Sequence, residues 1–433
     1  MEIMTQEQFA ERQGRRQPSG GHQQLDEAVQ AIIRQVQQDG DRALFDLTAQ
    51  FDGVQLADLA VSRPEINAAR ENVTDAFMDA LAEARDNITA FHEAQQEASW
   101  FLEQTNAKQL GQKVTPIEKV GLYIPGGTAA YPSTVLMNAI PARIAGVKQI
   151  IMTTPPGPDG RISDEVLAAA DLAGVTAIYK LGGAQAIAAL AYGTESIDRV
   201  SKITGPGNAY VARAKKWVYG DVAIDMIAGP SEICIVADDT APPSFAAADL
   251  LSQAEHDTDA AAICITNSSS EAKAIQAEIE KQIDQLERKA IIDQAFDQHG
   301  AIVVVNRLDE AFDIVNDLAP EHLQLMLADA GAYVDRVQNA GAIFLGHYSP
   351  EPLGDYFAGP NHTLPTSGTA KFASPLGVYD FIKRTSIIEY SASALEQAAD
   401  QIDRLARSEQ LTAHANSVQI RKEANHAAKR SQS

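Results

Sequence analysis

Strand-like and helix-like stretches alternate from about residue 119 to residue 345, and this alternation limits the chain to few folds. Short apolar runs are each followed, after a glycine or proline turn, by a longer stretch with helical spacing. Parallel strands joined in this way form sheets that helices cover on both faces. We therefore predict an α/β fold with two Rossmann-like parallel-sheet modules. The expected strands are 120–124, 149–153, 176–181, 232–237, 261–266, 301–305 and 342–345.

Sequence of helical character lies on both sides of these modules. Apolar residues recur at helical spacing over residues 25–50 and 64–96. We expect the helices of residues 20–118 to pack on the second module, and the polar stretch after Tyr379 to form a helical appendage. The expected domains are an extension at 1–24, an α/β domain of residues 25–120 and 231–378, an incomplete Rossmann-like domain at 121–230, and a tail at 379–433.

Charge and cysteine usage narrow the class of partner and the location. The 433 residues carry a formal charge of −23, so nucleic acid and anionic membranes are not expected as partners. The N-terminus lacks a signal peptide, and no apolar run approaches the roughly 20 residues that span a bilayer. Cys234 and Cys264 each lie inside an apolar run, which is typical of buried reduced thiols. These features favour a cytoplasmic protein.

Two glycine pairs occupy positions that could bind phosphate. Gly126-Gly127 and Gly182-Gly183 each follow an expected strand and precede an expected helix. Backbone N–H groups at such a turn can approach a dinucleotide. The full G-x-G-x-x-G pattern is missing, and a glycine turn after a strand can also be an ordinary turn.

Polar donors gather in four short stretches of the C-terminal half. Gln253 and His256 are three residues apart at the end of a predicted helix from Pro243, so both would project from one face toward one metal ion. A lone histidine on an apolar helix is more often a packed core residue than a metal ligand. The alternative to metal binding is a turn residue for Asp355 and a residue on a polar helix surface for His414.

Glu321 and His322 form an adjacent acid and imidazole. Such a pair offers two proton acceptors whose pKa values the surroundings can separate, as acid–base catalysis requires. The alternative is a carboxylate at a helix start beside a surface histidine. These residues alone leave both interpretations open.

Together, these motifs resemble the histidinol dehydrogenases, zinc enzymes that complete histidine biosynthesis. The resemblance extends from about residue 25 to about residue 421, which is nearly the whole chain. The segments that carry it are GLYIPGG at 121–127, GGAQA at 182–186, GPGN at 205–208, GPSE at 229–232, LLSQAEH at 250–256, APEH at 319–322, GDY with NH at 354–362, and EQLTAH at 409–414.

The resemblance implies a role for each residue of the site. His322 would be the general base, and Glu321 would activate the water that attacks an aldehyde. One zinc ion per subunit would have nitrogen and oxygen ligands, which suit a catalytic zinc with an open position. The implied zinc ligands are Gln253, His256, Asp355 and His414. The implied substrate contacts are Ser231, Gln253, His256, His322, Asp355, His362, Glu409 and His414. The implied NAD contacts are Tyr123, Gln185 and Asn208.

By the same resemblance, the reaction is oxidation of L-histidinol to L-histidine through L-histidinaldehyde, with reduction of two NAD molecules. Zinc would orient the substrate rather than generate a nucleophile. The 25–120 and 231–378 domain would hold zinc and substrate, and the 121–230 domain would hold NAD. A homodimer with exchanged tails is implied, in which Glu409 and His414 serve the other subunit's site.

Two other functions are compatible with parts of this pattern. A related zinc- and NAD-dependent dehydrogenase could act on another small hydroxy compound, although the intact Glu409 and Asn361-His362 favour histidinol. A zinc hydrolase could use Glu321 to activate water without any redox step, although the glycine turns at Gly126 and Gly182 argue against it.

Overall fold

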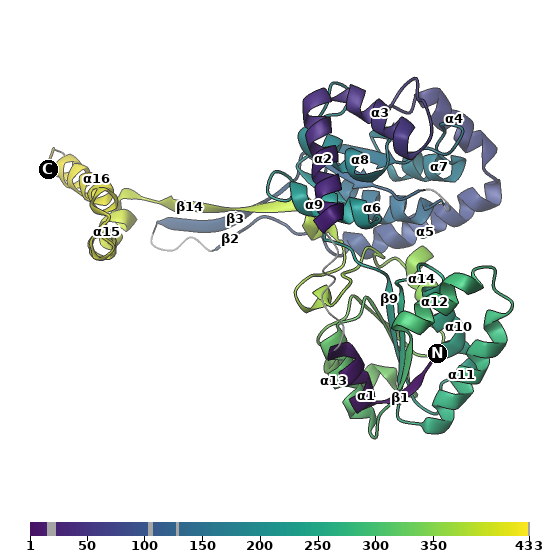
Figure 1. The fold of residues 1–433 in the computed structure, drawn as a ribbon. Coiled ribbons are helices and arrows are strands. Elements are labelled where there is room, and N and C mark those ends of the chain that lie inside the picture. The colour runs from purple at the N-terminus through teal and green to yellow at the C-terminus, as the bar shows by residue number, and fades with distance from the viewer. Residues whose placement is uncertain (15–22, 103–106, 127–129, 432–433) are drawn as a thin grey trace. The chain divides into compact units, whose positions relative to one another are not determined.

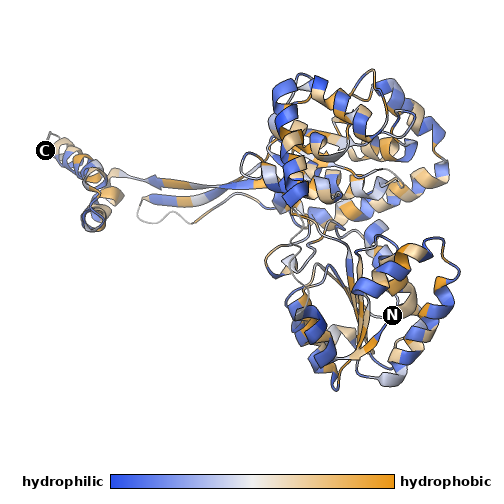
Figure 2. Ribbon diagram, viewed as in Figure 1, coloured by the Kyte–Doolittle hydropathy of each residue, from blue (hydrophilic) through white to orange (hydrophobic). Residues whose placement is uncertain are grey.

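The computed structural model describes residues 1–14, 23–102, 107–126 and 130–431, and the chain forms two compact units (Figure 1). The first unit comprises Met1–Gln95 and Ile117–Phe381, and the second comprises Gln96–Pro116 and Ile382–Ser433. Hydrophobic residues are frequent in the strands of the first unit (Figure 2), and they form buried clusters with residues of its helices. Within the described residues, no helix combines the length and apolar character needed to cross a bilayer.

One parallel sheet of the first unit has five strands in the order β6-β5-β4-β7-β8. Its carboxyl edge carries the turns that precede the following helices, which is where ligands bind in such sheets. The strands are β4 (Lys119–Tyr123), β5 (Gln149–Thr154), β6 (Ala177–Lys180), β7 (Lys202–Thr204) and β8 (Ala223–Ile224), and the connecting helices are α6 (Pro132–Ala145), α7 (Asp164–Ala173), α8 (Gly183–Tyr192) and α9 (Ala209–Val218).

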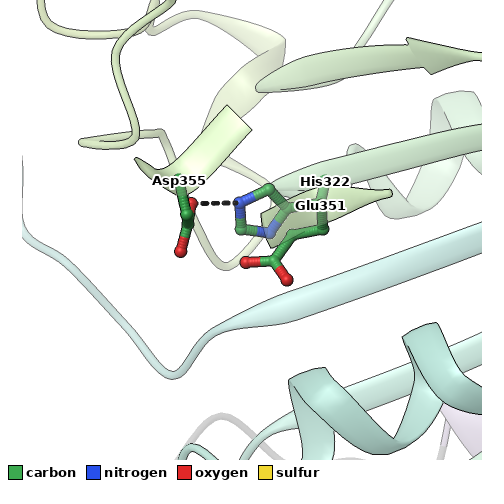
Figure 3. A group of neighbouring side chains, drawn as sticks. All are labelled: His322, Glu351 and Asp355. Carbon is green, nitrogen blue, oxygen red and sulfur yellow. Dashed lines mark ion pairs between the residues drawn. The ribbon is translucent and has the colours of Figure 1, made fainter. Parts of the chain in front are cut away.

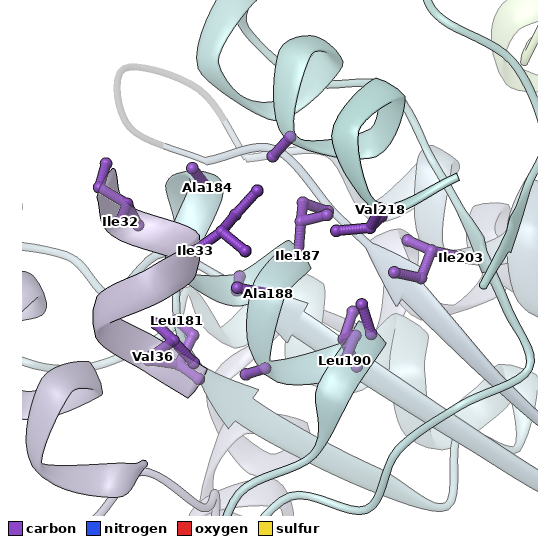
Figure 4. Packing of buried hydrophobic residues seen from close by; sticks show 14 of the residues in the cluster. Ile32, Ile33, Val36, Leu181, Ala184, Ile187, Ala188, Leu190, Ile203 and Val218 are labelled. Carbon is purple, nitrogen blue, oxygen red and sulfur yellow. The ribbon is translucent and has the colours of Figure 1, made fainter. Parts of the chain in front are cut away.

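The N-terminal helices pack against this sheet's helices. Ile33 and Val36 of α2 belong to one buried cluster with Ile187 of α8 (Figure 4). Contacts also join α2 to α9, α4 to α7 and α5 to α6. The expected packing of residues 20–118 on the second module is therefore wrong, because helical periodicity shows that a face is buried but not which surface covers it. The helices are α2 (Gln23–Asp39), α3 (Asp41–Phe51), α4 (Arg63–Asn72) and α5 (Asp75–Glu93).

The other sheet of the first unit has six parallel strands in the order β1-β11-β10-β9-β12-β13. Helices α10 (Pro243–Ala254), α11 (Ser269–Ile283) and α12 (Lys289–His299) share a core with one face. Helices α1 (Gln6–Gly14) and α13 (Leu308–Leu318) cover the opposite face. The strands are β1 (Ile3–Thr5), β9 (Glu232–Ala237), β10 (Ala261–Thr266), β11 (Ala301–Val304), β12 (His322–Met326) and β13 (Ala342–Leu345).

Two differences from the sequence-based expectation concern this second sheet. The expected extension at 1–24 contributes β1, an edge strand that pairs with β11, while residues 15–22 lie outside the described part of the chain. Strand β12 was not predicted, since its buried residues include His322 and Gln324. A central strand with polar side chains does not give the apolar run that identifies a buried strand.

The second unit is a three-stranded antiparallel sheet followed by two helices. The tail was expected to be helical from residue 379, but residues 382–390 form strand β14, which pairs along its whole length with β3. The partner strand lies more than 250 residues earlier, and such non-local pairing leaves little trace in local sequence. The elements are β2 (Trp100–Phe101), β3 (Lys108–Pro116), β14 (Ile382–Tyr390), α15 (Ala392–Ser408) and α16 (Thr412–Ser431).

Candidate active site

His322 is the first residue of β12, between β9 and β13, and its side chain is buried. Its Nδ1 lies 3.0 Å from the carbonyl oxygen of Glu232. Because a carbonyl oxygen only accepts, Nδ1 carries the proton and Nε2 keeps its lone pair. Nε2 has no hydrogen-bond partner among the described residues. Burial lowers the pKa of His322 to about 4, so the imidazole is neutral at neutral pH and can accept a proton at Nε2.

Glu321 immediately precedes β12, and its carboxylate is also buried. Its Oε2 accepts a hydrogen bond of 2.9 Å from the backbone N–H of Glu232. Burial raises the pKa of Glu321 well above the ordinary value, against the opposing effect of that hydrogen bond. A carboxyl group with a raised pKa can act as an acid or a base closer to neutral pH. Glu321 and His322 therefore lie at the start of a buried internal strand and not at a helix start.

Asp355 lies on the short helix α14 (Glu351–Tyr356), which begins after Pro350. Its Oδ1 is 3.9 Å from Nε2 of His322 (Figure 3). Glu351, one turn earlier on α14, joins them, and one ligand atom from each of the three residues lies within 4.8 Å of the others. Burial and the negative charge of Asp355 raise the pKa of Glu351 to about 9. Glu351 was not predicted from the sequence, because Gly354-Asp355 is typical of a turn and a turn does not place residues 351 and 355 on one helical face.

Gln253 occupies the last turn of α10 and is fully buried. Neither its Oε1 nor its Nε2 has a hydrogen-bond partner in the part of the chain that the structure describes. Leaving a buried amide without partners costs roughly 1–3 kcal/mol, so such a group usually has a bound ligand or water. His256 lies just beyond the helix and is exposed, and its backbone N–H donates to the Gln253 carbonyl at 3.3 Å.

A buried hydrogen bond sets α10 in register with β12. Nε2 of Gln324 donates to Oδ2 of Asp249 at 2.9 Å. Gln253 is one helical turn beyond Asp249, and His322 is two strand residues before Gln324. The helices of such a fold run antiparallel to its strands. The step from Asp249 to Gln253 along α10 and the step from Gln324 to His322 along β12 therefore point the same way, and each covers about 6 Å. The Asp249–Gln324 bond therefore places Gln253 at the level of His322.

These residues fit a metal ion, as the orphaned amide of Gln253 indicates. Asp355 supplies a carboxylate next to Nε2 of His322, and the proximity of His256 disfavours protonation of His322. Oxygen and nitrogen donors without a thiolate suit zinc in a catalytic site. His414, the remaining expected ligand, lies on α16 of the second unit, where its side chain is exposed.

The other expected substrate contacts have different surroundings. His362 is engaged at both ring nitrogens, with Nδ1 2.9 Å from the Asp355 carbonyl oxygen and Nε2 3.1 Å from Oγ1 of Thr134. Ser231 directly precedes β9 and is partly buried. Glu409 ends α15 in the second unit and is exposed. Among the expected contacts of the first unit, His322, Asp355 and His362 lie close together, whereas Glu409 and His414 belong to the second unit.

The three residues expected to contact NAD lie around turns at the carboxyl edge of the five-stranded sheet. The hydroxyl of Tyr123 accepts a hydrogen bond of 3.1 Å from the backbone N–H of Gly183 at the start of α8. The Gln185 side chain is buried and folds back over Gly183, where an added Cβ would lie 2.7 Å from its Oε1. Asn208 is exposed and caps α9, accepting from the Val211 N–H at 3.2 Å.

The glycine turns have partly structural reasons. A Cβ on Gly126 or Gly182 would lie within 3 Å of the Pro155 ring, so close packing alone requires glycine there. Gly127 lies outside the described residues. These turns leave the amino ends of the following helices at the sheet edge, a place suited to a dinucleotide phosphate.

Comparison with known proteins gives a consistent result. A family model described as histidinol dehydrogenase matches residues 15–422. The chain is 55% identical over 427 residues to a histidinol dehydrogenase of Oceanobacillus iheyensis, covering 99% of this chain and 100% of that protein. It is 50% identical to that of Bacillus subtilis, covering 94% of this chain and 95% of that protein. The crystal structure of the Elizabethkingia anophelis histidinol dehydrogenase superposes with a TM-score of 0.92 at 39% identity, covering 96% of this chain and 97% of that one.

Proposed function

The chain belongs to the histidinol dehydrogenase family and is an oxidoreductase of histidine biosynthesis, and from this premise we propose that it oxidises L-histidinol to L-histidine through L-histidinaldehyde. Two NAD molecules accept the two hydrides. One zinc ion per subunit is held by Gln253, His256, Asp355 and His414. A bound zinc ion would hold the substrate and thereby orient its reacting carbon.

The observation that carries this proposal is the neutral, buried imidazole of His322 with its unprotonated Nε2 beside Asp355. A general base needs a lone pair directed at the proton it removes and a neutral state at working pH. The Glu232 carbonyl supplies the orientation, because it holds the Nδ1 proton and keeps Nε2 available. In the proposed reaction, His322 takes the proton of the substrate hydroxyl while hydride passes to NAD from the carbon that bears this hydroxyl.

Glu321 serves the second half of the reaction. The bound aldehyde takes up water, Glu321 accepts a proton from that water, and the hydrate loses the second hydride to give the carboxylate. Burial raises the pKa of the Glu321 carboxyl, which supports this role because a carboxyl group with a raised pKa is a stronger proton acceptor. Retaining the aldehyde in the site prevents loss of a reactive compound. Ser231, His362 and Glu409 complete the proposed substrate contacts.

NAD is proposed to bind at the carboxyl edge of the five-stranded sheet, against Tyr123, Gln185 and Asn208. The convergence of Tyr123 and Gln185 on Gly183 supports this location. A homodimer with shared sites is proposed, and the exposure of Glu409 and His414 on the second unit agrees with service to another subunit. A cytoplasmic location is proposed from the two buried, unpaired thiols of Cys234 and Cys264.

The deciding experiment counts NADH formed per L-histidinol consumed, with and without a chelator. We expect two NADH per substrate, loss of activity on chelation, and recovery with zinc. Glu321→Gln should form one NADH and release aldehyde. One NADH per substrate in the unmodified enzyme would contradict the role of Glu321. No NADH from folded, zinc-loaded protein would overturn the histidinol assignment.

A further inference from the structure

Lys215 and Asp225 form an ion pair in the core of the five-stranded module, with side chains only 2% and 1% exposed. Both also bind the backbone of Gly205. Nζ of Lys215 donates to the Gly205 carbonyl oxygen at 2.9 Å, and Oδ2 of Asp225 accepts the Gly205 N–H at 2.8 Å. One buried pair of opposite charges thus holds both polar groups of a single glycine.

Gly205 is a point where the chain has little freedom. Its φ is +114°, a conformation that favours glycine. A Cβ there would lie 2.0 Å from the carbonyl oxygen of Tyr123. The turn therefore runs directly against Tyr123, and the Lys215–Asp225 pair fixes the peptide groups on both sides of the contact.

The position of this turn connects the ion pair to the carboxyl edge of the sheet. Gly205 directly follows β7, and Asn208, the N-cap of α9, lies three residues later. Tyr123 ends the neighbouring strand β4 and accepts the Gly183 N–H at the start of α8. Tyr123 thereby contacts both the turn before α8 and the turn before α9. Lys215 and Asp225 bind the backbone of the turn before α9.

Stability alone does not account for such a pair. A buried ion pair has a desolvation cost that its attraction offsets only with good geometry, and apolar residues of similar volume often stabilise as well. What apolar residues cannot do is bond both the N–H and the carbonyl oxygen of Gly205.

We propose that Lys215 and Asp225 are positioning residues for the dinucleotide. They act by holding the 205–208 turn against Tyr123, so that Asn208 and the amino end of α9 meet the ligand in a preformed arrangement. This inference rests on the proposed binding of NAD at this edge, and neither residue is assigned a contact with NAD.

The chain contains a matched control. Lys202 on β7 pairs with Asp380 at 2.8 Å, with side chains 9% and 22% exposed. Lys202 lies on the same sheet and this pair is largely buried, but no hydrogen bond joins either of its side chains to residues 205–208. Loss of the Lys202 charge therefore removes a buried ion pair while leaving Gly205 with both of its partners.

The test compares Lys215→Met with Lys202→Met in zinc-loaded enzyme. NAD is titrated calorimetrically without histidinol, and KM for NAD, KM for histidinol, zinc content and melting temperature are measured. We expect Lys215→Met to weaken NAD binding about tenfold or more and to raise KM for NAD, with zinc content and KM for histidinol unchanged. Lys202→Met should keep NAD affinity within about twofold of the unmodified enzyme, even where its melting temperature falls as much as that of Lys215→Met.

Asp225→Leu removes the acceptor of the Gly205 N–H with a side chain of similar size, and it serves the same test where Lys215→Met does not fold. NAD affinity within twofold of the unmodified enzyme in a folded variant of either kind would overturn the proposal. An equal loss of NAD affinity in Lys202→Met would overturn the proposal too, because removal of any buried ion pair in this module would then have the same effect. An unmodified enzyme that binds no NAD would refute the proposed function itself, which is a separate outcome.

Discussion

Nε2 of His322 lies 3.9 Å from Oδ1 of Asp355, across the gap between the start of β12 and the helix α14 (Figure 3). This separation is longer than a hydrogen bond and leaves the lone pair of Nε2 available. Asp355 can then face a cation while His322 faces a proton on the substrate. The two residues thus have separate tasks within one small volume.

Replacement of His322 should abolish most turnover without removing the metal. We expect His322→Gln to lower kcat by about 10² to 10⁴, the usual contribution of a positioned general base. Zinc content should stay near one per chain, since His322 is not among the proposed ligands. Steady-state kinetics and metal analysis check this, with His347→Gln as a control outside the site. Loss of zinc together with activity would instead make His322 a ligand.

Replacement of Gln253 by an apolar residue should maintain or raise the stability of the zinc-free protein and should weaken its binding of zinc. Gln253→Met removes two buried polar atoms that have no partner among the described residues, so the zinc-free variant should unfold at equal or higher denaturant concentration. Its zinc affinity should fall by at least about tenfold. Gln276→Met is the matched control, because the Gln276 amide bonds the Met1 carbonyl at 2.7 Å. That control should lose stability and keep zinc. A destabilised zinc-free Gln253→Met would contradict the argument.

The Asp249–Gln324 bond predicts a pH-dependent stability defect. Burial raises the pKa of Asp249 to about 6, and Gln324→Leu removes its hydrogen-bond donor. Above that pH the variant buries a charge without a partner and should lose roughly 1–3 kcal/mol. The defect should shrink as pH falls and Asp249 takes up a proton. Urea unfolding of the zinc-free proteins at pH 8 and pH 5 measures this. In the Asp249→Asn background, Gln324→Leu should lower the free energy of unfolding by the same amount at pH 8 and at pH 5.

His92 should make the fold sensitive to mild acid. It is fully buried, its Nδ1 lies 2.9 Å from the Ile88 carbonyl oxygen, and burial lowers its pKa below the ordinary 6.5. As pH falls below about 6.5, His92 takes up a proton in the unfolded chain but stays neutral in the folded chain. The free energy of unfolding therefore decreases. The stability advantage over His92→Gln should therefore be larger at pH 7.5 than at pH 5.5. An advantage that does not change with pH would show that His92 does not contribute in this way.

Much of the fold and part of the site followed from local sequence. All seven expected strands are present, because a buried parallel strand needs a short apolar run between turns, and that requirement is visible residue by residue. The resemblance to a known family also gave the expected zinc ligands and the Glu321–His322 pair. The first unit brings Glu321, His322 and Asp355 close together.

Sequence by itself determined two parallel sheets, their connecting helices and the types of side chain available for chemistry. Tertiary structure alone decided that α2 to α5 pack on the helices of the five-stranded sheet, that residues 108–116 pair with 382–390, and that Glu351 joins His322 and Asp355. It also brought Lys215 and Asp225 onto one glycine. The physical reason is shared by all four. Local periodicity records that a face or a charge must be buried, whereas its partner is chosen by contacts between segments that are distant in the chain.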